Sequence, residues 1–538
     1  MVSLFNALNI SSNALTVNES AISVVSHNVA NMNTEGYSKQ KVNLATRNIA
    51  GAIGDSTEAQ IRANGGVMIA NVMRYNDSYL NNYYRDQLSI LKGYEAQLEN
   101  LGDLEDVFND LEGEGISAAL ASFYEAVNNL NEYPASSTAR INFLESAKTL
   151  TATLNAKSAQ LSELTGKALG DGESQEALEA SKIYKEFSVF NDKLDELAEV
   201  NKALQITQTG TLEANNLLDQ RDMILNDIAQ FVNIKVEENP HNGSVTLSVG
   251  GQELVKGAKV VGELDIQTAK DYCAENGLTY PVDWVTADGK PREAAVISIV
   301  SRTEAGVTPI LDDANSIITG GSLGGLLHST DTDIDGMNAG KAMDALNTIA
   351  GSIADVFNDL NTRNGAYSID PNDTSKLVAT NPNNFIFTAT DGTVDNITAE
   401  NISINPDMLT GDGHWNIACA YFKDQANFDE NAIGNAQNVV DMLGTRNQKL
   451  PELNNTSIED YYTNLLGKIA SGGSNAQALV DTQTSVVDSI FNKIRSNNSV
   501  DLNEELVDLV KYQTAYSAAA QVFNTCNSCL DVLMALGG

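Results

Sequence analysis

The carboxy-terminal segment, residues 501–538, reads DLNEELVDLVKYQTAYSAAAQVFNTCNSCLDVLMALGG. Its apolar and small residues alternate spacings of four and three, which is typical of the seam of a long heptad helix. Asp501 stands at the N-cap position, and Gly537 follows as a helix-ending residue. From Tyr512 onward Asp531 is the only charged residue, so we expect other protein to cover most of this helix. The predicted seam is Leu502, Leu506, Leu509, Gln513, Tyr516, Ala520, Phe523, Asn527, Leu530 and Met534.

The amino terminus has the same pattern. Between Met1 and Thr34 the only charged residue is Glu19, so this helix also lacks a charged outer face. We expect the two terminal helices to pair, with the rest of the chain on one side. The pairing could be an intramolecular coiled coil, but the uncharged outer faces favour burial between subunits. The predicted seam here is Leu4, Leu8, Ser11, Leu15, Asn18, Ile22, Val25 and Val29.

Composition excludes several classes of function. The chain of 538 residues has a formal net charge of −38, which argues against a nucleic-acid partner because phosphate binding needs basic patches. Four cysteines are too few for a disulfide scaffold. Neither a cleaved signal nor an apolar run long enough to span a membrane is recognisable. The sequence therefore predicts a cytosolic protein, or one exported without a cleaved signal.

The interior is mostly helical, with two regions of different character. Near Val232 the period of the pattern changes to two, and Gly250-Gly251 is typical of a hairpin turn. Seven of the nine prolines lie between Pro240 and Cys419, which separates this region from its helical flanks. Helices are predicted at about 80–108, 116–132, 136–164, 175–204, 212–231, 333–362, 432–443, 458–470 and 475–495.

These patterns predict a multidomain α plus β fold. It would have paired terminal coiled-coil helices, a long helical bundle and inserted β-rich outer domains. The terminal core is expected at 1–45 with 497–538, and the helical middle domain at 46–235 with 326–365 and 429–496. A β-rich outer domain is expected at 236–325 and a second β-rich insertion at 366–428.

Three motifs suggest chemistry but fit other interpretations better. Gly320-Gly321-Ser322-Leu323-Gly324 matches the nucleophile elbow of α/β-hydrolases, yet the alternating β-α pattern that this motif needs is missing. We interpret it as a glycine-rich junction. Asp331 to Gly336 resembles half of a calcium loop, but the position of the bidentate Glu is Ala342. Cys526 and Cys529 form a C-x-x-C inside a heptad helix, where buried small hydrophobes are expected. No catalytic residue, metal or cofactor is predicted.

The motif Ser26-His27-Asn28-Val29-Ala30-Asn31-Met32-Asn33-Thr34 resembles the shared amino-terminal signature of the axial proteins of the bacterial flagellum. Gly36-Tyr37-Ser38-Lys39-Gln40 is similar to the GYSRQ of their hook-associated members. Three further stretches resemble the same members: 217–222 (LLDQRD), 320–327 (GGSLGGLL) and 501–505 with 512–516. Asn28, Asn31, Asn33, Thr34, Gly36 and Tyr37 are the signature residues that match.

This resemblance implies a structural role. Members of this group form a ring of identical subunits at the hook–filament junction, so the implied neighbours are the hook protein on one side and a second junction protein and flagellin on the other. The resemblance also implies an extracellular location, type III export without a cleaved signal, and a cytoplasmic export chaperone on the carboxy-terminal helix. We expect the terminal helices to be disordered in the free monomer, because isolated helices gain too little to offset the ordering entropy.

Other functions stay open at this point. The chain could be a hook protein or a flagellin-like subunit, although the stretches 36–40 and 217–222 argue against flagellin. A serine hydrolase using Ser322 and a surface adhesin are alternatives from other classes. The residues expected at the assembly interface are Leu4, Leu8, Leu15, Ile22, Val25, Val29, Leu502, Leu506, Leu509, Tyr516, Phe523, Leu530 and Met534.

Overall fold

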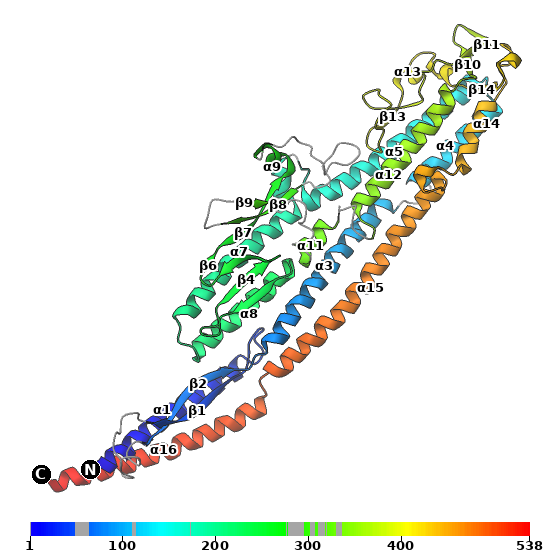
Figure 1. The fold of residues 1–538 in the computed structure, drawn as a ribbon. Helices are drawn as coiled ribbons and strands as arrows, with labels where there is room; N and C mark the ends of the chain where they lie inside the picture. The colour runs from blue at the N-terminus through cyan, green and yellow to red at the C-terminus, as the bar shows by residue number, and fades with distance from the viewer. Residues whose placement is uncertain are drawn as a thin grey trace.

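The computed structural model shows an elongated molecule in which both termini lie together at one end (Figure 1). It describes residues 2–48, 64–109, 115–172, 174–275, 277, 295–301, 307–309, 318, 320–329 and 336–537. A long body of helices carries small sheets on one side, and a narrow tail carries the two ends of the chain (Figure 1). The pairing of the terminal helices that the sequence predicts is therefore present within a single chain.

Most helices form where the heptad and capping patterns predict them. Asp77, Ser136, Thr211 and Ser457 each accept a backbone N–H bond at the start of a helix, as N-cap residues do. The helices are α1 Val2–Ala30, α3 Ser78–Phe108, α4 Gly115–Glu132, α5 Ser137–Leu169, α6 Gln175–Ala180, α7 Lys182–Ile206, α8 Leu212–Phe231, α9 Ala269–Glu275, α11 Gly321–Leu327, α12 Ala339–Thr362, α13 Pro406–Leu409, α14 Gln437–Gly444, α15 Ile458–Asn498 and α16 Leu502–Gly537.

Two helical regions are divided differently from the prediction. The helices expected at 458–470 and 475–495 are one helix of 41 residues, α15. Gly472 and Gly473 lie against α3 and do not end the helix. A Cβ at Gly473 would lie 2.4 Å from the carboxylate of Glu105 on α3. The helix expected at 175–204 is instead divided at Ser181, whose side chain caps α7.

Among the described residues the strands form five small sheets, and every strand pair there is antiparallel. The predicted turn at Gly250-Gly251 is confirmed, because Val249 pairs with Gln252. The strands are β1 Gln40–Asn48, β2 Asn64–Arg74, β3 Lys235–Glu238, β4 Val245–Val249, β5 Gln252–Lys256, β6 Lys259–Val260, β7 Gly262–Thr268, β8 Ala295–Ser301, β9 Val307–Pro309, β10 Ala366–Asp370, β11 Asp373–Ala379, β12 Phe387–Ala389, β13 Ile402–Ile404 and β14 Ala420–Tyr421.

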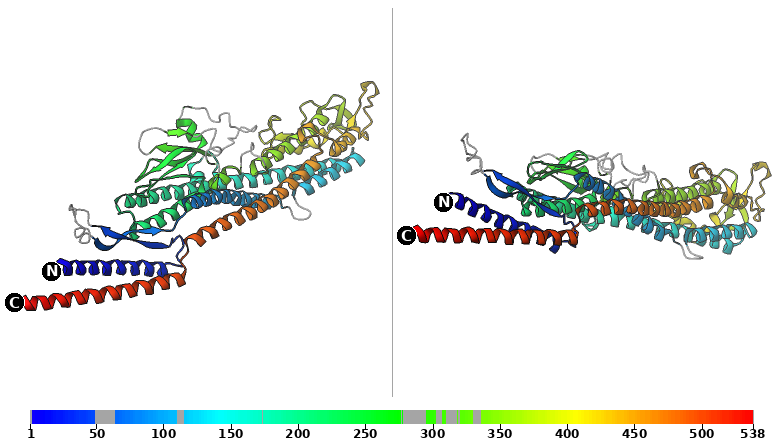
Figure 2. Two further views of the ribbon diagram at one scale, coloured as in Figure 1. Left: turned by 60° about the horizontal axis from the view of Figure 1, so that its bottom comes forward. Right: turned by 90° about the horizontal axis from the view of Figure 1, so that it is seen from below.

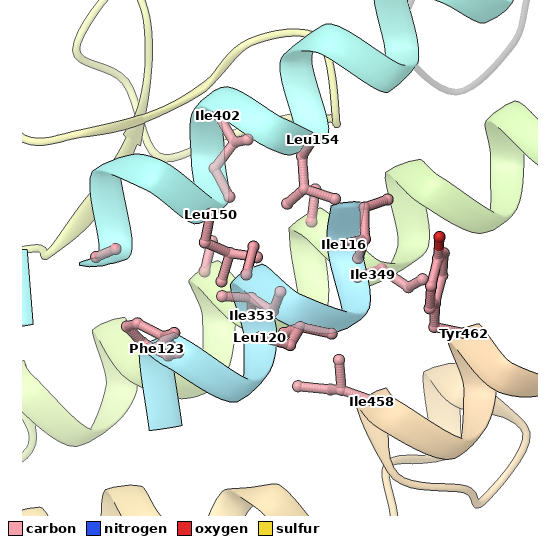
Figure 3. Close-up of a cluster of buried hydrophobic side chains, with 14 of the residues drawn as sticks. Ile116, Leu120, Phe123, Leu150, Leu154, Ile349, Ile353, Ile402, Ile458 and Tyr462 are labelled. Atoms are coloured by element: carbon pink, nitrogen blue, oxygen red, sulfur yellow. The ribbon is translucent and has the colours of Figure 1, made fainter. Parts of the chain in front are cut away.

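The main hydrophobic core lies in the half of the body farthest from the termini. Figure 3 shows Ile116, Leu120 and Phe123 of α4 facing Leu150 and Leu154 of α5. Side chains from three further elements complete the cluster, namely Ile349 and Ile353 of α12, Ile402 of β13, and Ile458 and Tyr462 of α15 (Figure 3). Burial of each such side chain contributes about 1.5–3 kcal/mol. Because Ile402 belongs to this core, the segment predicted as a second β-rich insertion packs as part of the helical body.

A second core joins α7 and α8 to the sheets β3–β6 and β7–β9. Ile183, Phe190 and Leu197 on α7 pack with Leu247 and Ile266 from the strands. The fold class predicted from sequence, a multidomain α plus β chain with paired terminal helices, is confirmed. No helix in the described ranges is both long and apolar enough to cross a bilayer.

The tail has three layers. Helix α1 lies between the antiparallel pair β1–β2 on one side and α16 on the other (Figure 2). Val42 and Val72 of the strands pack with Val24 and Val25 of α1 and with Tyr512 of α16. The pair β1–β2 is not among the elements predicted from the sequence. The chain passes from the tail to the body through residues 75–77, between β2 and α3, and returns through the short link between α15 and α16.

Candidate assembly interface

Helix α16 faces α1 with a line of residues seven apart. Glu505, Tyr512, Ala519 and Cys526 are its buried residues, and α1 is the element that α16 packs along. This line lies one position before Leu506, Gln513, Ala520 and Asn527, which are four of the ten residues of the predicted seam. The displacement arises because α16 is apolar around much of its circumference, so the heptad pattern fits more than one stripe.

The predicted interface residues consequently divide by exposure. Val25 is buried against α16 and the strands, whereas Leu502, Leu506, Tyr516 and Met534 are exposed in the single chain. These four side chains are therefore not buried against α1. The remaining members are partly buried: Leu4, Leu8, Leu15, Ile22, Val29, Leu509, Phe523 and Leu530.

The outer side of α16 presents an apolar surface that no part of the described chain covers. Val507 is 67% exposed and Val510 is 61% exposed, beside Leu502 and Leu506. Val532, Leu533 and Met534 extend the exposure at the far end. Contiguous exposed apolar surface of this kind marks an interaction site.

Asn28 joins three segments where the tail meets the body. Its Nδ2 donates to the Gln40 carbonyl oxygen at 2.8 Å and to Glu505 Oε2 at 3.0 Å. Its Oδ1 accepts from the Tyr37 hydroxyl at 2.7 Å and from the Gln40 backbone N–H at 3.0 Å. Lys39 Nζ lies 2.6 Å from Glu504 Oε2 and 3.3 Å from Glu505 Oε1. One buried amide thus connects α1, the start of β1 and the first turn of α16.

The other signature residues shape the turn after α1. Asn31 Nδ2 donates to the His27 carbonyl oxygen at 3.0 Å, and the Thr34 hydroxyl donates to Asn31 Oδ1 at 3.3 Å. Gly36 has a φ of +76° and sits against the side chain of Met223 on α8, so a Cβ at this position would clash. Asn33 is exposed at the edge of a cavity of about 410 Å³ between the tail and the body.

A buried ion cluster that the sequence analysis did not predict lies on the body side of this joint. Asp219 and Asp222 of α8 accept from Arg74 of β2, at 2.7 Å and 2.8 Å. Asp222 also pairs with Arg85 of α3 at 3.1 Å and with Arg221 at 2.8 Å. Burial alone would raise the pKa of Asp222, but its three guanidinium neighbours together hold that pKa well below its usual value.

The cluster continues into the tail, since Asp219 accepts the backbone N–H of Ser38 at 3.3 Å and Asn215 donates to Gln40 Oε1 at 3.0 Å. Sequence 217–222 was noted above only as a resemblance. The signal that could have revealed its role is the presence of charged residues at positions where helices α3 and α8 are buried.

The glycines of the Gly320–Gly324 motif and the following Gly325 allow α11 to pack closely against its neighbours. Gly321 has a φ of +72°, and a Cβ there would lie 2.1 Å from the backbone of Phe231. A Cβ at Gly325 would lie 2.6 Å from the Ala96 Cβ on α3. The Ser322 hydroxyl donates to Glu186 of α7, and burial raises the pKa of that carboxyl group. Ser322 therefore sits in a helix that packs closely against α3.

Two other motifs were singled out in the sequence, the C-x-x-C and the calcium-like stretch. Cys526 is buried, Cys529 is exposed, and both are free thiols. Within the described ranges no group of three His, Cys, Asp or Glu side chains is placed to hold a metal ion. The calcium-like stretch 331–335 lies outside the described residues, and Ala342 is buried in α12.

Residues 101–371, half of the chain, match the family model described as the helical domain of flagellar hook-associated protein FlgK. The chain belongs to the FlgK family. Two shorter matches flank that region: residues 8–37 fit the model of flagellar basal body rod proteins, and 496–536 fit the carboxy-terminal model of basal body rod FlgEFG proteins. Membership of this family agrees with the place of the signature residues Asn28, Asn31 and Tyr37, which lie where the tail meets the body.

Relatives of full length support the assignment to the FlgK family. The chain is 27% identical to flagellar hook-associated protein 1 of Bacillus subtilis (strain 168) over 547 residues, covering 100% of both chains. It is 23% identical to the protein of that name from Salmonella typhimurium, covering 98% of this chain and 99% of the relative. The solved structure of the flagellar hook junction protein FlgK from Burkholderia pseudomallei has the same fold, with a TM-score of 0.55, 14% identity, and coverage of 78% of this chain and 100% of that one.

Proposed function

We propose that this FlgK-family chain is a structural adaptor of the bacterial flagellum. Copies of it form a ring at the hook–filament junction that couples the hook to the filament and on which filament assembly depends. The observation that carries the proposal is the family match over half of the chain, with relatives named as hook-associated proteins along its full length. A hook protein or flagellin-like subunit is disfavoured by the same match.

Self-association through the tail is the physical basis of the proposal. The apolar outer side of α16 has no cover in the single chain, and an assembly of identical copies supplies one. The exposed interface residues Leu502, Leu506, Tyr516 and Met534 would then be buried between subunits. In this proposal the tail forms an inner tube, the helical body forms an outer tube, and the β-rich segments project outward.

The proposed neighbours follow from the place in the flagellum. The hook protein lies on one side of the ring, and a second junction protein and flagellin lie on the other. The chain reaches this extracellular site by type III export without a cleaved signal. A cytoplasmic chaperone covers α16 before export, because its exposed apolar side chains would otherwise favour aggregation. The chain acts as a structural component, and no enzymatic activity is proposed.

The test is the location of the protein on the cell, combined with one substitution. Immunolabelling under the electron microscope should place the protein at the base of each filament. Leu506→Asp puts a charge on the exposed side of α16, so the monomer should fold normally while filaments are lost. Label along the whole filament, or normal filaments in the Leu506→Asp strain, would contradict the proposal.

A further inference from the structure

The pair β1–β2 has two halves that are separated by an irregularity. The pairing is regular up to Asn43 and then shifts before Leu44, where β2 has one extra residue. Such a residue is a β-bulge and interrupts the ladder. We call residues 40–43 with 71–74 the body-side half, and residues 44–46 with 66–69 the outer half.

The backbone of the body-side half is bound to helix α8 and to the turn before it. The Val72 N–H donates to the Gly210 carbonyl oxygen at 2.7 Å, and the Val72 carbonyl oxygen accepts from Asn215 Nδ2 at 3.0 Å. Gly210 has a φ of +76°, and a Cβ there would lie 2.8 Å from the Cβ of Asn71. The turn before α8 therefore lies directly against β2.

Buried polar side chains also attach this half to the body. Gln40 Oε1 accepts from Asn215 at 3.0 Å, and Gln40 Nε2 donates to Asn216 Oδ1 at 3.1 Å. Withdrawal of the strands from α8 would also separate the ion pair of Arg74 with Asp219. Both of these side chains are buried, so separation of this pair is strongly unfavourable.

The outer half has a different support, which is helix α1. A Cβ at Gly66 would lie 3.2 Å from Ile10 Cγ2 of α1. Within the described ranges, no hydrogen bond or ion pair joins residues 44–46 or 66–69 to the helical body. The bulge thus marks the point where attachment to the body ends.

We infer that the body-side half of β1–β2 folds together with the body and stays in place when the terminal helices are undocked. The outer half becomes ordered only when α1 packs on it. Undocking of α1 exposes Val42 and Val72, but it leaves the bonds from this half to α8 and to Gly210 intact. The division belongs to the single chain and does not depend on the proposed ring.

The body-side half is then a preformed platform for the terminal helices. The Lys39 N–H donates to the carbonyl oxygen of Asn498 at 3.0 Å, so the residue before β1 is also held by the end of α15. The Lys39 side chain is thereby placed to receive Glu504 and Glu505 when α16 docks. The tail assembles from the joint outward, toward the ends of the chain.

Hydrogen exchange of the full-length chain, kept dilute and monomeric, tests this division. The Val72 amide is the reporter, because its acceptor Gly210 belongs to the body. We expect protection factors at 71–74 that are roughly tenfold or more above those at 66–69. Equal protection of the two halves, whether both are fast or both are slow, would overturn the inference.

Two substitutions separate the two supports. Ala21→Asp places a charge in the buried contact between α1 and the strands, so 2–30 should exchange rapidly while Val72 keeps its protection. Asn215→Ala removes a donor to both strands, so protection at 71–74 should fall roughly tenfold while α5 is unchanged. The matched control is Gln220→Ala, because Gln220 is an exposed residue of α8, and it should change neither region.

Loss of Val72 protection in Ala21→Asp would show that α1 supports the whole strand pair, and the inference would be wrong. This result decides the question even if the terminal helices of the wild-type monomer prove to be ordered, or if Asn215→Ala also loosens α5. Unchanged protection at 71–74 in Asn215→Ala would equally contradict attachment through α8.

Discussion

Asn28 holds the joint of the molecule with a single side chain. Its amide satisfies the backbone N–H and carbonyl oxygen of Gln40, the Tyr37 hydroxyl and the Glu505 carboxylate, all in a region closed to water. A buried group that loses its partner costs about 1–3 kcal/mol. The signature asparagine is thus explained by geometry: only an amide can donate and accept in this arrangement.

Asn28→Ala should therefore loosen the first turns of α16 in the assembled junction, where α16 is ordered. The expected loss of about 1–3 kcal/mol corresponds to roughly a 5- to 150-fold faster amide exchange at 503–512. Hydrogen exchange followed by mass spectrometry measures this directly. The control is Asn9→Ala, because Asn9 is an exposed residue of α1, the helix that also carries Asn28. This substitution should leave exchange at 503–512 unchanged. Equal exchange in both variants would show that the joint does not depend on Asn28.

Asp222 makes stability depend on pH. Its folded-state pKa lies below the ordinary value of about 4, so its ion pairs contribute fully above that value and are lost as the pH falls below it. Asp222→Asn leaves Arg74, Arg85 and Arg221 without this carboxylate and should cost about 3–5 kcal/mol near neutral pH.

The difference in stability between wild type and Asp222→Asn should therefore shrink between about pH 4 and pH 2. Denaturant unfolding of both proteins at several pH values in this range provides the measurement. Asp227, a partly exposed residue on the same helix that pairs with Lys193, gives the control substitution Asp227→Asn. A difference that stays constant down to the acid limit would contradict the assigned role of the cluster.

At the scale of elements, two kinds of glycine should respond in opposite directions. Gly321→Ala needs a Cβ at 2.1 Å from the Phe231 backbone at a positive φ, so it should destabilise the body by about 3 kcal/mol or more. Gly467 lies inside α15 with open space around its missing side chain, so Gly467→Ala should stabilise by up to about 1 kcal/mol. Thermal unfolding of both variants tests this. A neutral Gly321→Ala would contradict the close approach of α11 to the Phe231 backbone, and a destabilised Gly467→Ala would contradict the open space around Gly467 on α15.

Helices were predictable where the pattern and the caps agree. The stretch ending in Phe231 has both a periodic apolar face and the N-cap residue Thr211, and its bounds match the structure closely. The stretch ending in Glu132 has a strongly periodic apolar face, and its bounds match as well. Gly472 and Gly473 were misread as a break because a sequence cannot show that α3 packs closely against them. The pair β1–β2 escaped notice because only Val42 and Val72 face the core, too few for a clear alternation.

At the scale of the whole molecule, the sequence predicted that the two ends pair but not which side of α16 faces inward. Its apolar residues nearly surround the helix, so heptad spacing alone allowed several seams, and the observed one follows Glu505 and Tyr512. The joint was equally hidden, because Asn28, Asp222 and Arg85 come from distant parts of the chain. Their contacts depend on the tertiary arrangement, which local patterns do not contain.

The central claim is that the tail becomes stably ordered only when neighbouring copies cover it. The direct measurement is hydrogen exchange at 2–30 and 502–537 in the dilute monomer and in the assembled junction, with α5 and α12 in the body as internal references. The account predicts rapid exchange of both terminal helices in the monomer, well above that of the references, and strong protection after assembly. Terminal helices that are already as protected in the monomer as α5 and α12 would contradict it.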